Sequence, residues 1–146
     1  MQTTKFLAAC AFFLLLGSQI QAQSSEVSHH TFVVPYQFTK VNIDLNTDNV
    51  EIRPIKGTRI FVEQHIKINS DNHHLLNFLI QQKRYELEFT TDEANKSMYL
   101  SDKKNNPKVE IREMKFEEHC KYIIFVPTSV VDVNLTNSSQ HTAATK

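Results

Sequence analysis

The sequence predicts an all-β fold with one short helix. Stretches in which apolar and polar residues alternate recur about every ten residues, and this is the two-residue period of half-buried strands. Between them lie clusters of Asn, Asp and Ser, which form turns by hydrogen bonding to nearby backbone. A single segment has helical spacing instead. Short strands at these intervals are typical of a sandwich, a barrel or a solenoid, and the pattern does not choose among them.

The first 22 residues are typical of a secretory signal peptide. Lys5 supplies a positive charge, residues 6–17 form an apolar core too short to span a bilayer comfortably, and Ala22 is a small residue at a cleavage position. Cys10 precedes most of the apolar core, which argues against a lipid anchor. We expect cleavage after Ala22, no membrane span in the product, and export to the periplasm, the cell surface or the medium.

The remaining residues are nearly neutral in charge and sufficient for one domain. Of the 16 Lys and Arg, Lys5 lies in the signal segment, so 15 stand against 16 Asp and Glu. This balance predicts no basic face, and we expect no nucleic-acid partner. Of the two cysteines only Cys120 follows residue 22, which excludes an intramolecular disulfide. Because Cys120 opens an apolar run, we expect it to be buried rather than to link two chains.

After cleavage, we divide the chain into an N-terminal lead-in (23–40), a β-rich domain (41–137) and a flexible tail (138–146). Residues 23–30 are polar and aperiodic, which predicts a mobile lead-in followed by a short strand that Pro35 confines to an edge or an end. The tail has no periodic apolar residues and therefore little to pack with.

Within the domain, alternating stretches predict strands at 41–45, 50–52, 59–69, 85–89, 98–100 and 109–116. The longest, 59–69, places four apolar residues on one face with Gln64 as the single interruption. Gly57 is the only glycine after residue 22 and is the candidate for a positive φ angle. Residues 102–107 are charged and rich in Asn, which predicts a surface loop.

The helical segment begins near Leu75. Its apolar residues have helical spacing, Ser70 or Asp71 is the expected cap, and Lys83 and Arg84 supply positive charge near the end. About three turns of helix are marginal alone. We therefore expect the helix to lay its apolar face on a sheet.

The last part of the domain predicts two strands joined at Pro127. Residues 122–126 form an apolar run typical of a strand buried on both faces. Val131, Val133 and Leu135 then alternate with polar residues, which predicts a strand with one buried face. We expect these two strands to form the central pair of the fold.

Two segments carry a resemblance to a known family: residues 41–62 (VNIDLNTDNVEIRPIKGTRIFV) and 121–135 (KYIIFVPTSVVDVNL). They resemble the adhesin families of bacterial envelopes, the head-GIN-type and adhesin-like β-solenoid domains. Asn49 stands where those domains usually have Gly, which the turn tolerates because Asn adopts the left-handed conformation readily. The chain also stops soon after the Pro strand, where those domains continue.

The resemblance implies a single β-solenoid-like domain, with a β-sandwich as the alternative. It also implies an exported, non-enzymatic protein that binds an envelope or surface protein or a glycan, with no catalytic residues to carry over. The alternative hypothesis is a small periplasmic protein that binds a ligand or a metal.

The metal hypothesis rests on the seven histidines. His73 and His74 are adjacent and would diverge on a helix, so they do not easily share one ion. His119 and Cys120 would point to opposite faces of a strand. His65 is a further candidate without a partner at zinc-site spacing. We therefore predict no metal residues.

Acidic residues around 44–51 do not form a calcium loop either. Asp44, Asn46, Asp48 and Glu51 lack the Gly and the final Glu of an EF-hand, and a turn explains them. No nucleophile elbow or activated cysteine is present in the sequence. We predict no catalytic residues, no cofactor and no enzymatic activity.

Overall fold

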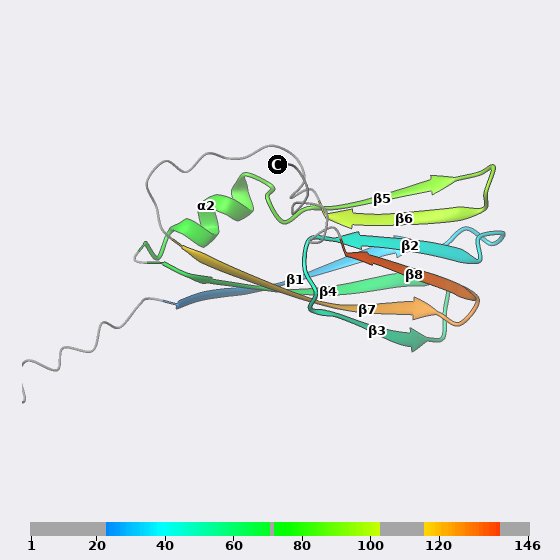
Figure 1. Ribbon diagram of the computed structural model, residues 1–146, viewed down its shortest axis with the longest axis horizontal. Coiled ribbons are helices and arrows are strands. Elements are labelled where there is room, and N and C mark those ends of the chain that lie inside the picture. The colour runs from blue at the N-terminus through cyan, green and yellow to red at the C-terminus, as the bar shows by residue number, and fades with distance from the viewer. Residues whose placement is uncertain (1–22, 71, 103–115, 138–146) are drawn as a thin grey trace, which may run out of the picture.

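The chain folds into two four-stranded sheets that pack face to face, with one short helix beside them (Figure 1). The computed structural model describes residues 23–70, 72–102 and 116–137. The predicted signal peptide (1–22), the tail (138–146) and most of the predicted strand at 109–116 lie outside these residues. Within them, no helix is long and apolar enough to cross a membrane.

The first sheet, sheet A, has the strand order β1-β4-β7-β3. These strands are β1 (Gln23–Val33), β4 (Arg59–Asn69), β7 (Glu117–Pro127) and β3 (Val50–Ile55). β4 pairs antiparallel with both β1 and β7, whereas β3 runs parallel to β7.

The second sheet, sheet B, has the order β5-β6-β2-β8. Its strands are β5 (Leu87–Asp92), β6 (Ser97–Asp102), β2 (Lys40–Leu45) and β8 (Asp132–Asn137). β2 runs parallel to both β6 and β8, and β5 is antiparallel to β6.

The all-β prediction is confirmed, but the predicted solenoid is wrong: the described residues form a sandwich of two mixed sheets. A β-solenoid stacks its strands in parallel, whereas β1, β4 and β5 each pair antiparallel here. The two segments that resemble solenoid domains do pair in parallel, as β3 with β7 and β2 with β8. The antiparallel strands added around them convert this arrangement into a sandwich.

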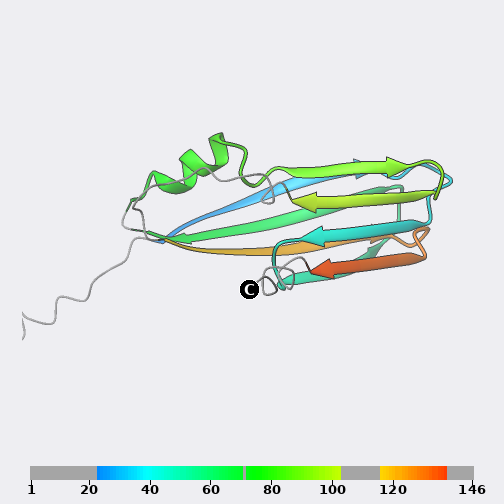
Figure 2. The ribbon, with the colours of Figure 1, turned by 45° about the horizontal axis from the view of Figure 1, so that its top comes forward.

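The predicted helix is confirmed as α2 (Leu75–Gln81). Three strands of sheet A have eleven residues and every strand of sheet B has six, so sheet B covers only part of sheet A. Figure 2 shows α2 over the uncovered end of the long strands. Leu75, Leu76 and Leu79 are buried there in the same core as the strands. The helix therefore completes the second layer.

The start of α2 differs from the prediction. The N-cap residue is His74, without a side-chain cap bond, and the last turn has no basic residue. Ser70 instead accepts a hydrogen bond at its Oγ from the backbone N–H of Asn72 (3.2 Å), and Asn72 accepts one from the N–H of His74 (2.9 Å). The two polar side chains therefore shape the turn before the helix.

The apolar alternation places the core correctly. The fully or nearly fully buried apolar residues of β2, β4 and β6 face between the layers: Val41, Ile43, Leu45, Ile60, Val62, Ile66, Ile68, Met98 and Leu100. Gly57 has φ +142°, as predicted, whereas Asn49 is not among the positive-φ residues of the described chain. Cys120 is buried, also as predicted.

The two strands around Pro127 do not pair with each other, contrary to the prediction. β7 is a central strand of sheet A, and β8 is an edge strand of sheet B, so the Pro corner carries the chain from one layer to the other. Val131 is 80% and Leu135 is 43% exposed, although the pattern predicted them to be buried. Val131 precedes β8, and Leu135 lies on an edge strand with a neighbour on one side only, which leaves its side chain partly uncovered.

The predicted lead-in is also different. Residues 23–33 form β1, an eleven-residue strand that pairs along its whole length with β4. Residues 23–30 are polar, and backbone hydrogen bonds hold them to β4, whereas Phe32 packs against the core near the end of the strand.

Candidate functional site

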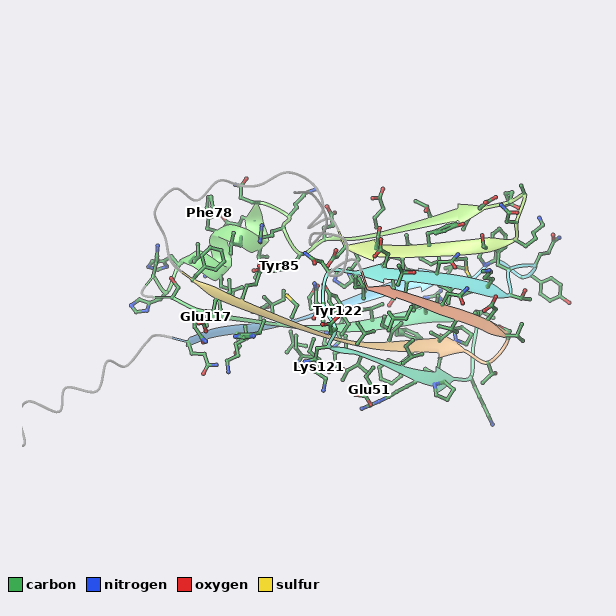
Figure 3. The ribbon with its side chains drawn as sticks, in the orientation of Figure 1. Glu51, Phe78, Tyr85, Glu117, Lys121 and Tyr122 are labelled. Atoms are coloured by element: carbon green, nitrogen blue, oxygen red, sulfur yellow. The ribbon has the colours of Figure 1, made fainter. Side chains whose placement is uncertain are left out.

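A groove runs along the free edge of β1, the edge that does not pair with β4. It is a cavity of about 520 Å³ bounded by residues 26–30 of β1 on one side, with Ile66 of β4 and Ile80 of α2. The opposite wall follows α2 and consists of Lys83, Tyr85 and Glu86. We call this feature the β1 groove. Figure 3 shows Tyr85 in the segment that follows α2.

The free backbone edge of β1 faces this groove. Val34 donates its backbone N–H to Thr58 O over 2.9 Å, and these two residues continue the β1–β4 register by one step beyond Val33 and Arg59. In an antiparallel pair the bonded residues alternate, so the even-numbered residues of β1 bond to β4. The N–H and C=O groups of odd-numbered residues such as Val27 and His29 therefore point away from β4. This explains why both residues line the groove although their side chains share the sheet face of Glu63 and His65.

β1 lacks several of the features by which natural edge strands avoid pairing, although Glu26 places a charge on its inner face. It has eleven residues, contains neither Pro nor Lys, and keeps one uninterrupted register with β4. The other three edge strands, β3, β5 and β8, have six residues each, and β3 contains Pro54. Among the described strands, β1 is therefore the edge best suited to accept another strand.

Beneath the groove, polar side chains enter the core. His30 Nε2 lies 3.2 Å from Ser28 Oγ and 3.3 Å from Gln64 Oε1. Gln64 is fully buried and donates from Nε2 to Tyr122 Oη over 2.9 Å. The groove is thus connected to a hydrogen-bonded chain that crosses β4 and reaches β7, whose Tyr122 is labelled in Figure 3.

This series of hydrogen bonds ends on a buried carboxylate, that of Asp102. Tyr122 donates its hydroxyl to Asp102 Oδ2 (3.5 Å), which also accepts the backbone N–H of Asn46 (3.1 Å). Asp102 is 3% exposed, so this residue, predicted to open a surface loop, instead ends β6 inside the sandwich. Burial, and next the Asp102 charge, raise the pKa of Tyr122 well above its usual range, which keeps the hydroxyl protonated as a donor.

A second polar contact, the ion pair of Arg84 and Glu118, connects the segment after α2 to sheet A. Arg84 forms a bidentate pair with Glu118, from Nε to Oε1 (3.3 Å) and from Nη2 to Oε2 (3.0 Å). The hydrogen bonds that Arg84 donates to Glu118 raise the pKa of Arg84. Burial, and then Glu118, raise the pKa of the neighbouring Tyr85 well above its usual range. The wall of the β1 groove is therefore anchored to β7.

The histidines considered for a metal site lie apart. His65 contacts Glu63, and His119 and Cys120 point to opposite faces of β7, as predicted. His73 and His74 precede α2 with their rings edge to face. Within residues 23–70, 72–102 and 116–137, no group of three His, Cys, Asp or Glu side chains is placed to hold a metal ion.

The acidic residues near the 46–49 turn are separated as well. Asp44 lies on β2 in sheet B, whereas Glu51 lies on β3 in sheet A. Glu51 accepts a hydrogen bond from Arg53 (2.7 Å) and lies 3.9 Å from Lys121 Nζ, pointing away from sheet B (Figure 3). The structure does not bring these residues together into one site.

Sequence reasoning missed the residues of the groove. Ser28 and His30 lie in a segment without periodicity, and Tyr122 lies in the apolar run 122–126, which predicts burial but no hydrogen-bonded partner. The one available signal was Gln64, a polar residue on an otherwise apolar strand face. A buried amide requires hydrogen-bond partners, and those partners lead to the groove.

Comparisons with known proteins give little further information. No family model and no curated protein match the chain. A solved structure described as a "putative cell adhesion protein" from Clostridium sporogenes ATCC 15579 is similar to it at 14% identity and a TM-score of 0.30. The match covers 75% of this chain and 47% of that one, so this chain spans about half the length of its neighbour. At this TM-score the likeness assigns no function, and the resemblance to head-GIN-type domains stays a prediction.

Proposed function

We propose that this chain is an exported, non-enzymatic, adhesin-like binding domain that takes up an extended segment of a partner on the free edge of β1. The observation that carries the proposal is that edge: eleven residues in one register, open on one side and bordered by a groove. The signal-peptide pattern of residues 1–22 supports export, since a surface partner must be met outside the cytoplasm.

Strand addition suits this site physically. Main-chain hydrogen bonds to an exposed sheet edge supply affinity, and pockets that receive alternate side chains supply selectivity. The odd-numbered residues of β1 offer the main-chain hydrogen bonds. The β1 groove offers the side-chain pockets, with apolar Ile66 and Ile80 beside charged Lys83 and Glu86.

Binding of protein-coated beads to intact bacterial cells tests the proposal. Val27→Pro removes an N–H group that faces the groove and should abolish binding, whereas Val27→Thr keeps that group and the branched side chain and should bind like the parent. Cell fractionation tests the address in parallel. Equal binding by the Pro variant would overturn strand addition, and finding the uncleaved chain in the cytoplasm would overturn export.

The alternative function, capture of a small ligand, is favoured by the volume of the same groove. About 520 Å³ is within the usual range of small-molecule sites. A ligand that binds only the folded protein raises its melting temperature. Thermal melts of the parent with added zinc, copper and a panel of small metabolites separate the two functions, because a ligand site predicts an upward shift in melting temperature and strand addition predicts none with these additives.

A further inference from the structure

We infer that the segment taken up by β1 is β1 of a second copy of this chain, paired antiparallel about a two-fold axis at Ser28. The inference rests on the proposed function and names its partner. It makes the contact homophilic: two sandwiches join edge to edge, and their A sheets become one continuous sheet.

The backbone parity of β1 permits this pairing. A two-fold axis at Ser28 pairs residues whose numbers add to 56, so Val27 faces His29 of the second copy. Both residues are odd-numbered, and the odd-numbered residues are those whose N–H and C=O groups point away from β4. Every bonded pair of the new ladder therefore uses groups that the parent sheet leaves unused.

A polar cross-strand contact selects the register. At this axis Glu26 lies opposite His30 of the second copy, and the symmetry makes that contact twice. A slip of two residues in either direction instead places Glu26 opposite Ser28 or Phe32. Because Gln64 Oε1 can only accept, His30 Nε2 donates to it, so Nδ1 must carry a second proton to donate to the incoming carboxylate.

The position of the groove agrees with the same axis. It is lined by residues 26–30 of β1, a span centred on Ser28. Glu26, Ser28 and His30 lie on the inner face of β1, where their cross-strand neighbours on β4 are buried. The same three side chains of the second copy therefore enter the groove. Ile80, which is 36% exposed in its wall, is then covered.

Cross-linking tests the register. Ser28 and its symmetry mate form a non-bonded antiparallel pair with Cα atoms about 4.5 Å apart, within disulfide range. Ser28→Cys should therefore oxidise to a covalent dimer. The matched control is Ser24→Cys, the same change on the same strand and face, whose two copies lie about 27 Å apart in this register and should stay monomeric. The parent protein, oxidised in the same way, controls for cross-linking through the cysteines that it already contains, of which Cys120 is buried.

Sedimentation equilibrium measures the association itself. The parent and Val27→Thr should form dimers, and Val27→Pro should not. Glu26→Lys removes two cross-strand contacts and should weaken the dimer by roughly 2- to 30-fold. If Val27→Pro fails to fold, the two cysteine variants decide the question.

The results separate this inference from the proposed function. A parent protein that is monomeric at every concentration, or equal cross-linking of Ser28→Cys and Ser24→Cys, overturns the homophilic pairing. If cell binding is nevertheless lost in Val27→Pro alone, strand capture stands with a different partner. If cell binding also survives that change, both proposals fail.

Discussion

Gln64 on β4 donates a hydrogen bond to the hydroxyl of Tyr122 on β7 over 2.9 Å, and neither side chain is accessible to solvent. Each residue satisfies a buried polar group of the other, in a core that is otherwise apolar. The pair also connects the β1 groove with Asp102, since Gln64 meets His30 and Tyr122 meets Asp102. Stability and site geometry are therefore coupled at this contact.

Tyr122→Phe should lower the free energy of unfolding by about 1–3 kcal/mol, because it removes the hydroxyl that accepts from the buried Gln64 amide and donates to the buried Asp102 carboxylate. The double variant Tyr122→Phe with Gln64→Leu should lose less free energy of unfolding than the sum of the two single losses. Both changes remove the same hydrogen bond. Urea denaturation of the parent, the two single variants and the double variant measures the coupling. Strict additivity would show that the two residues do not interact.

The two buried tyrosines predict alkaline sensitivity. Burial raises the pKa of Tyr85 and of Tyr122, so above about pH 10 the unfolded chain releases protons that the folded chain retains. The contribution of the two tyrosines to the free energy of unfolding is complete below that pH. Above it, this contribution declines by about 1.4 kcal/mol per tyrosine per pH unit. Denaturation between about pH 9 and pH 11 should show a shallower decline in Tyr122→Phe than in the parent. Tyr36→Phe, at a fully exposed site, should keep the parent slope.

Breaking the Arg84–Glu118 pair should destabilise the joint between α2 and β7. The two side chains are only 25% and 15% exposed and make two hydrogen bonds, so Glu118→Gln should cost about 1.5–3 kcal/mol. Asp132→Asn, which breaks the exposed Lys40–Asp132 pair, is the control and should cost at most about 1 kcal/mol. Thermal melts of the two variants compare the losses, and equal losses would contradict the structural role of Glu118.

Ile124→Asp should unfold the domain. The residue is fully buried on a central strand, so the substitution places an unpaired charge between the sheets at a cost comparable with much of the roughly 5–15 kcal/mol stability of a domain. Val131→Asp, at a position 80% exposed, should leave the melt within about 0.5 kcal/mol of the parent. A folded Ile124→Asp protein would place the core elsewhere.

Ending the chain after Asn137 should leave the thermal melt unchanged. β8 ends at Asn137, and residues 138–146 have no periodic apolar residues with which to pack. Loss of folding in this truncation would show that the tail contributes to the domain.

The sequence determined what depends on local chemistry. The two-residue period predicts the all-β class and the inward face of β4, because alternate side chains of a strand point to opposite sides. The helical spacing near Leu75 predicts α2, and Gly57 marks the turn that needs a positive φ angle. An apolar neighbourhood likewise predicts the burial of Cys120.

Only the tertiary structure decided which strands pair, and with it the candidate site. Hydrogen bonds between strands join backbone groups that every residue except Pro carries in full, so neither the parallel pairing of β3 with β7 nor the polar strand β1 has a side-chain signature. The same reason hides the exposed Leu135 of β8 and the buried Asp102 of β6, whose environments depend on the neighbouring strands. The free edge of β1 and its groove exist because β4 pairs on one side of β1 and no described strand pairs on the other.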